Sequence, residues 1–64
     1  MQTLRIVRRR GLMELTRLSM ATIYRLIGRG DFPRPMKLST HAVGWDLADV
    51  EAWIDARKAA GAVG

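Results

Sequence analysis

The side chains of this sequence best suited to chemistry are arginines. Eleven Lys or Arg residues stand against six Asp or Glu, with one histidine and no cysteine. A planar guanidinium donates to two acceptors at once, such as two phosphate oxygens or the O6 and N7 atoms of guanine. The composition therefore favours recognition of a polyanion through charge and hydrogen bonds.

Catalysis is disfavoured by residue type and by length. His41 has no cysteine or second histidine to work with, and no pair of carboxyl groups stands in an apolar stretch that would tune an acid against a base. A chain of 64 residues folds around one core and seldom walls a catalytic pocket of roughly 300 Å³ or more. We expect a protein that is not an enzyme and that uses no cofactor and no metal.

Charge is unevenly distributed along the chain. Residues 1–37 carry nine Lys or Arg and two acidic residues, a net charge of +7, whereas residues 38–64 carry two against four, a net charge of −2. A basic half joined to an acidic half indicates a polyanion met by one face, and charge alone leaves DNA, RNA and an anionic membrane open. A solvated basic surface without any partner is the plainer alternative.

A first helix of about two turns is expected where Leu12, Met13 and Leu15 form a brief apolar patch. Gly11 weakens it, since glycine inside a helix costs about 1 kcal/mol relative to alanine.

The second helix has the clearest local signals. Ser19 is an N-cap whose hydroxyl accepts the N–H of Ala21 or Thr22, and Leu18 and Ile23 are spaced as a hydrophobic staple. The helix should end near residues 28–30. Helical spacing turns Ile23, Leu26 and Ile27 toward the core, and the other face holds Ala21, Tyr24, Arg25, Gly28 and Arg29.

The second half predicts a hairpin and a third helix. Pro33 and Pro35 make residues 32–35 extended, and residues 36–38 and 42–45 suit two strands joined by a turn at residues 39–41. Asp46 caps a helix that Gly61 ends. The apolar face of this helix comprises Leu47, Val50, Trp53, Ile54 and the stem of Arg57.

Two short helices joined by residues 16–19, then a hairpin and a closing helix, form the layout of a helix-turn-helix with a wing. In that motif the second helix enters the major groove of DNA. Arg25 lies between the small residues Ala21 and Gly28, with Tyr24 and Arg29 beside it, so it is placed to bridge a guanine. An amphipathic helix with merely solvated arginines would show the same spacing.

Several motifs in order, Leu15–Ser19, Thr22–Ile27, Phe32–Pro35, Lys37–Leu38, Val43–Trp45 and Val50–Ile54, strongly resemble the AlpA-like family of small prophage regulators. The match covers roughly Ile6 to Lys58. The resemblance implies a mainly α fold with a small β-hairpin, a winged helix-turn-helix of three helices and a two-stranded wing, related to excisionases and MerR-type domains. It also implies binding to promoter or attachment-site DNA.

Within this resemblance, Ser19, Thr22, Tyr24 and Arg25 match the recognition-helix motif, and Lys37, Thr40 and His41 match the wing. The recognition helix is expected over about residues 19–29 and the wing over about residues 36–45. The predicted base-reading set is Ser19, Met20, Ala21, Thr22, Tyr24, Arg25 and Arg29. The predicted backbone and wing set is Arg8, Arg9, Arg10, Arg17, Arg34, Lys37, Thr40 and His41.

Three positions depart from the family pattern. Members usually carry glycine where Arg17 stands, an acidic residue where Gly11 stands and an apolar residue near Arg9. The first departure affects the tightness of the turn and the second weakens the first helix. The additional arginines strengthen attraction to phosphates.

The aromatic residues have structural alternatives to a binding role. Trp45 and Trp53 are predicted in the core rather than as stacking platforms for bases, with Trp53 beneath the hairpin, and Phe32 is predicted to plug the core there. Tyr24 either packs beside the first helix or gives its hydroxyl to a phosphate. His41 is either a wing contact or solvent-exposed.

The predicted function is that of a sequence-specific transcriptional regulator that binds double-stranded DNA of prophage or mobile-element genes. Two alternatives remain: an excisionase that bends attachment-site DNA, and a non-specific nucleic-acid binder. RNA polymerase or integrase is the expected protein partner. We expect one domain over residues 1–64 with flexible ends at 1–5 and 60–64, a monomer that binds cooperatively on DNA, and a cytoplasmic, nucleoid-associated location without membrane contact.

Overall fold

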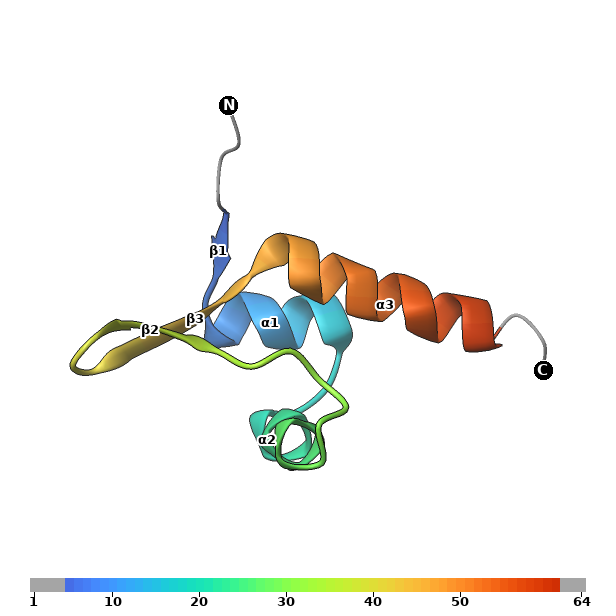
Figure 1. Ribbon diagram of the computed structural model, residues 1–64, viewed down its shortest axis with the longest axis horizontal. Helices are drawn as coiled ribbons and strands as arrows, with labels where there is room; N and C mark the ends of the chain where they lie inside the picture. Colours follow the sequence, from blue (N-terminus) through green and yellow to red (C-terminus); the bar gives the residue numbers. More distant parts are fainter. Residues whose placement is uncertain (1–4, 62–64) are drawn as a thin grey trace.

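A computed structural model describes residues 5–61 of the chain. Its elements follow in the order β1 (Ile6–Val7), α1 (Arg9–Thr16), α2 (Met20–Gly28), β2 (Met36–Ser39), β3 (Ala42–Asp46) and α3 (Leu47–Gly61). The β2–β3 hairpin projects to one side of the helices (Figure 1). This is the predicted fold, three helices with a small antiparallel hairpin in a winged helix-turn-helix arrangement.

The first helix is short because little apolar surface holds it. Leu12 is completely buried and Met13 packs against the core. Leu15, predicted to share this apolar patch, is 47% exposed. The Thr16 hydroxyl donates to the Leu12 carbonyl at 2.8 Å and accepts the Leu18 N–H at 3.3 Å, so one side chain stabilises the end of α1 and the start of the next turn.

The second helix begins and ends as predicted. Ser19 has extended backbone angles and its hydroxyl accepts the N–H of Thr22 at 3.2 Å, the second of the two expected donors. Ile23 is completely buried, while Leu26 and Ile27 pack around it. The helix ends at Gly28.

The sheet has three strands in the order β1-β3-β2, all antiparallel. The hairpin was predicted, whereas β1 was not. It has only two residues, too few for an alternating pattern, and it pairs Ile6 with Asp46 and Val7 with Trp45. Its position ties the beginning of the described chain to the start of α3, because the Leu47 N–H donates to the Arg5 carbonyl at 2.9 Å.

The third helix starts at the predicted cap, since Asp46 Oδ1 accepts the Ala48 N–H at 3.0 Å. It runs through Ala60 to Gly61, the last described residue. Of the ends expected to be flexible, residues 1–4 and 62–64 lie outside the described part of the chain.

Both tryptophans pack in or against the core, but at different depths. The buried cluster comprises Val7, Leu12, Ile23, Phe32, Trp45 and Val50. Trp45 is fully buried and its indole N–H donates to the Pro33 carbonyl at 3.0 Å. Trp53 is half-buried beside the α2–β2 loop, where its ring meets Phe32 at 4.8 Å between centroids and its N–H donates to the Asp31 carbonyl. The tryptophan at the centre of the core is therefore the one in β3.

Candidate nucleic-acid interface

The solvent face of α2 carries the residues expected to read bases. Ala21, Tyr24, Arg25 and Gly28 are all exposed, and Ile23 anchors the opposite face in the core. The cap at Ser19 fixes where the helix starts, and burial of Ile23 fixes its rotation. Arg25 consequently points away from the core between two small residues.

Two members of the predicted base-reading set are less exposed than the others. Met20 packs against the buried cluster, and Thr22 is half-buried, with its hydroxyl accepting from Ser19 Oγ at 3.1 Å. The N-cap hydrogen bonds therefore use the hydroxyl groups of both Ser19 and Thr22. Ala21, Tyr24 and Arg25 are exposed and remain available on this helix.

Arg29 and Tyr24 each have a partner within the protein. The Arg29 Nε atom lies 3.5 Å from a carboxylate oxygen of Asp31 in an exposed ion pair. The ring of Tyr24 lies 6.5 Å from that of Trp45, so it lies near the third strand. It remains 42% exposed, which leaves its edge available to a ligand.

The turn between α1 and α2 contains a backbone conformation that L-residues rarely adopt. Arg17 has φ 61° and ψ 26°, in the left-handed region, and is the non-glycine residue with positive φ among residues 5–61. Its N–H donates to the Met13 carbonyl at 2.7 Å, which closes the C-terminus of α1. Its side chain is exposed, as a phosphate contact requires.

The hairpin carries the predicted wing residues on its accessible parts. Thr40 and His41 form the turn between β2 and β3, and Lys37 lies in β2 opposite Val43. All three predicted wing residues are exposed, as is Arg34 in the preceding loop. They extend the basic surface beyond α2.

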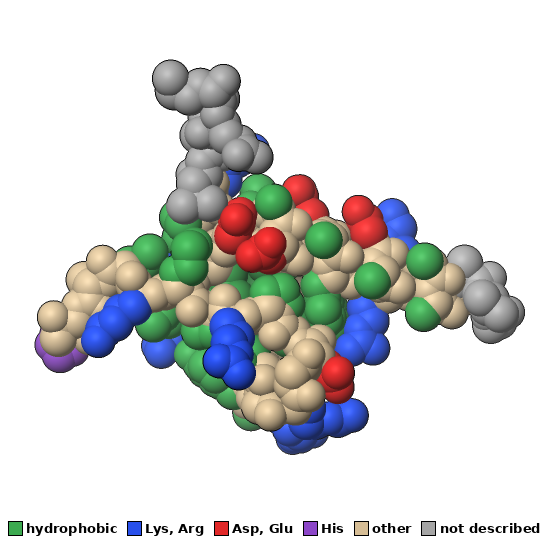
Figure 2. All heavy atoms as spheres, in the orientation of Figure 1, with side chains coloured by type: hydrophobic (Ala, Val, Ile, Leu, Met, Phe, Trp, Pro, Cys, Tyr) green, Lys and Arg blue, Asp and Glu red, His purple; other side chains and the backbone are tan. Residues whose placement is uncertain are grey.

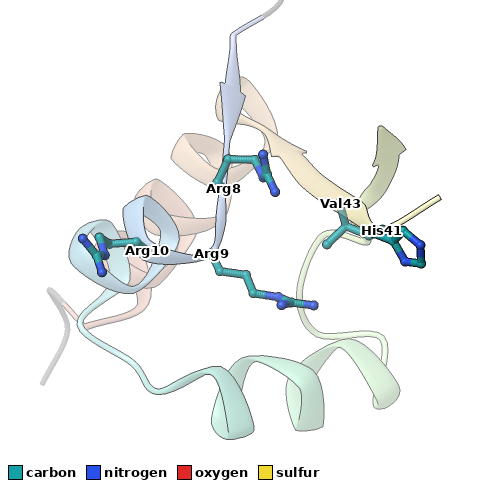
Figure 3. A pocket seen from close by; sticks show the side chains of 5 residues that line it. All are labelled: Arg8, Arg9, Arg10, His41 and Val43. Atoms are coloured by element: carbon teal, nitrogen blue, oxygen red, sulfur yellow. The ribbon is translucent and has the colours of Figure 1, made fainter. Parts of the chain in front are cut away.

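The start of α1 faces the hairpin across a hollow of about 170 Å³, which we call the arginine pocket. It is lined by Arg8, Arg9, Arg10, His41 and Val43. Arg8 and Arg9 extend toward the hairpin, whereas Arg10 extends on the other side of the helix start (Figure 3). The structure therefore brings three predicted backbone-contact arginines together with one predicted wing residue.

Most of the acidic side chains visible in Figure 2 lie over α3, and basic side chains lie along the hairpin, around α2 and near the end of α3. Asp31 is an exception, since it pairs with Arg29 just after α2. A second hollow between α1 and α3 is lined by Leu15, Glu51, Ile54 and Asp55. This acidic and apolar face repels a polyanion, so the surface that suits nucleic acid is the one formed by α2, the hairpin and the start of α1.

Sequence reasoning missed two residues of this arrangement. Val43 forms the apolar wall of the arginine pocket, and Gly44 lets the side chains of Ile6 and Leu38 cross the central strand. A Cβ on Gly44 would lie 2.5 Å from Ile6 Cγ2 and 3.0 Å from Leu38 Cδ1. A glycine inside a strand is a recognised sign of close approach, and this signal was present in the sequence.

The winged helix-turn-helix class of DNA-binding proteins is defined by three features that this fold contains. They are a capped second helix with small residues and arginine on its exposed face, a tight turn before that helix and a hairpin wing beside it. Within this class, the model of the family described as "Prophage CP4-57 regulatory protein (AlpA)" matches residues 5–58. The chain belongs to the AlpA family, as its motifs had indicated.

A curated relative supports the same placement. The chain is 43% identical over 47 residues to the "Uncharacterized protein ORF88" of Enterobacteria phage P4. The alignment covers 73% of this chain and 53% of the relative, so the chain spans about half the length of that protein. The family description names a prophage regulatory protein. Within residues 5–61, no helix combines the length and apolar character that crossing a membrane requires.

Proposed function

We propose that this protein is a transcriptional regulator that binds a specific sequence in double-stranded DNA, with α2 in the major groove and the hairpin against the flanking backbone or minor groove. The observation that carries the proposal is the exposed face of α2, where Arg25 stands between Ala21 and Gly28 on a helix whose rotation is set by the core. An α-helix with its side chains is about 10–12 Å across, which fits the major-groove width of about 12 Å.

Arg25 is proposed to bridge the O6 and N7 atoms of a guanine. Its guanidinium fork matches these two acceptors, and the small neighbours let the backbone approach the base edges. Ala21 and Thr22 lie nearer the N-terminus of α2, the part of a recognition helix that commonly meets bases. We do not assign Met20 and Arg29 to base reading, because Met20 packs against the core and Arg29 pairs with Asp31.

The remaining basic side chains are proposed to contact phosphates. Lys37 and His41 are exposed on the hairpin, Arg17 is exposed in the turn, and Arg34 is exposed in the loop before β2. Contacts of this kind add affinity without sequence preference and make binding depend on salt. Each Lys or Arg removed should lower the slope of log affinity against log salt by about one unit.

Binding-site selection from random duplexes tests the base-reading assignment. Wild type, Arg25→Ala and Arg25→Lys are compared, with Lys58→Ala as a control that removes one positive charge from an exposed site on α3. Arg25→Ala is expected to cost about 1–3 kcal/mol at the selected site and to relax preference at one base pair. Lys58→Ala should leave the selected sequence unchanged.

Arginine-to-lysine exchange distinguishes base reading from simple charge. Lysine keeps the charge but lacks the two-pronged donor, so Arg25→Lys should also relax the selected sequence. If all the proteins enrich one site with the same stringency, Arg25 contacts the backbone and the proposed reading is wrong.

The acidic and apolar face between α1 and α3 is proposed as the contact for a protein partner of the regulator, either RNA polymerase or integrase. Glu51 and Asp55 line its hollow together with Leu15 and Ile54, a mixture suited to a partner surface with apolar and basic side chains.

We also propose that the protein is a monomer in solution and that several copies bind side by side on DNA. Sedimentation with duplexes containing one or two selected sites tests this, and a stable dimer without DNA would contradict it.

A further inference from the structure

The arginine pocket is a concentration of positive charge that the described protein does not neutralise. Arg8 is the N-cap of α1 without a side-chain hydrogen bond, and Arg9 and Arg10 follow in a first turn that has no acidic residue. Among residues 5–61, the ion pair within 4 Å is that of Arg29 with Asp31, so these three arginines have no carboxylate partner there. The positive end of a helix dipole adds to the repulsion.

The lining of the pocket indicates the anion that would relieve this repulsion. The Leu12 N–H is the first to bond back along α1, to the Arg8 carbonyl at 2.9 Å, and the N–H groups of Arg9, Arg10 and Gly11 precede it. Free amide groups at a helix start and guanidinium forks both suit phosphate oxygens. Val43 adds an apolar wall, which a free phosphate would not use but a deoxyribose ring would.

We infer that the arginine pocket binds one phosphodiester of the DNA backbone, held by Arg8 and Arg9 at the start of α1, with the adjoining sugar against Val43 and His41 closing the hairpin side. This inference rests on the proposed binding to duplex DNA and goes beyond it, because it assigns one nucleotide to two separate elements. The start of α1 and the wing then hold the same point of the backbone. Arg10 also lines the pocket, but its side chain extends on the other side of the helix start, and we assign it only general attraction (Figure 3).

The test combines a protein variant with the removal of one phosphate charge at a time. Duplexes carrying the selected site receive a single neutral methylphosphonate at successive backbone positions, and affinities are measured for wild type, Arg9→Gln and Arg10→Gln. At one position, wild type should lose on the order of tenfold or more in affinity, as expected for a lost charge-assisted bidentate contact. Arg9→Gln should lose little further affinity at that position, because both changes remove the same contact.

Arg10→Gln is the matched control, since it removes the same charge from the same exposed turn. Its loss should add to that of the methylphosphonate at every position. If the affinity loss of Arg9→Gln also added to that of the methylphosphonate at every position, the inference would be overturned. Circular dichroism of both variants checks that α1 is retained.

A second arm separates the DNA backbone from free phosphate as the ligand. Inorganic phosphate at millimolar concentration and constant ionic strength should not displace DNA from wild type more than from Arg9→Gln. Displacement specific to wild type would assign the pocket to free phosphate and overturn the inference. A protein that binds all duplexes alike, without position dependence, contradicts the proposed function and this inference together, whereas selection of a site with fully additive losses contradicts the pocket alone.

Discussion

Replacing Arg17 with glycine should stabilise the protein while weakening its binding to DNA. Arg17 has φ 61° and ψ 26°, a left-handed conformation that costs an L-residue roughly 1–2 kcal/mol. Glycine avoids this cost but loses about 0.5–1 kcal/mol more chain entropy on folding. The hydrogen bond from its N–H to the Met13 carbonyl belongs to the backbone and is retained. We expect a net gain of about 0.5–1 kcal/mol in the free energy of unfolding, or a few degrees in Tm.

Arg17→Ala separates backbone conformation from charge. Alanine keeps the penalty of the left-handed region and removes the same charge as glycine, so its stability should stay within about 0.5 kcal/mol of wild type. Urea unfolding followed by tryptophan fluorescence measures the three stabilities. The two variants should lose DNA affinity equally and lower the salt slope by about one unit each. A glycine variant no more stable than the alanine variant would refute the reasoning.

Three further predictions concern the core, the sheet and the cap. Trp45→Ala should cost about 3–5 kcal/mol and Trp53→Ala about half of that, because only the first ring is fully buried; equal losses in chemical denaturation would contradict the difference in depth. Gly44→Ala should cost about 1–3 kcal/mol by pushing Ile6 away, and NMR should show weaker β1–β3 pairing; an unchanged spectrum would exclude the clash. Ser19→Ala should lower the free energy of unfolding by about 1 kcal/mol and Ser19→Gly by a few tenths of a kcal/mol. If calorimetry gave equal losses for the two variants, the N-cap would not contribute to stability.

Elements built from neighbouring residues could be predicted from the sequence. The start of α2 depends on Ser19 and Thr22, which are three positions apart, and its end lies at Gly28, with Gly30 two residues further on. The cap of α3 at Asp46 is equally local. Such signals survive in one sequence because both partners of each contact lie within one turn of helix.

The depth of the tryptophans and the presence of β1 could not be predicted in this way. Trp45 in β3 pairs with Val7 of β1, and its indole N–H donates to the Pro33 carbonyl in the α2–β2 loop, so its burial depends on three different parts of the chain. Trp53 has similar apolar neighbours in sequence yet lies at the edge of the core. Hydrophobic periodicity indicates which face of an element is apolar, but not how many other elements cover that face.

The same distinction, between local features and features set by tertiary packing, applies to the candidate site. The sequence by itself determined that α2 presents Arg25 outward, since caps and helical spacing set the direction of a side chain within one element. Only the tertiary structure decided that Arg9 and His41 share one pocket. The physical reason is that a pocket between two elements depends on how they pack, and packing is decided by contacts such as Val7 with Trp45 between residues far apart in the sequence.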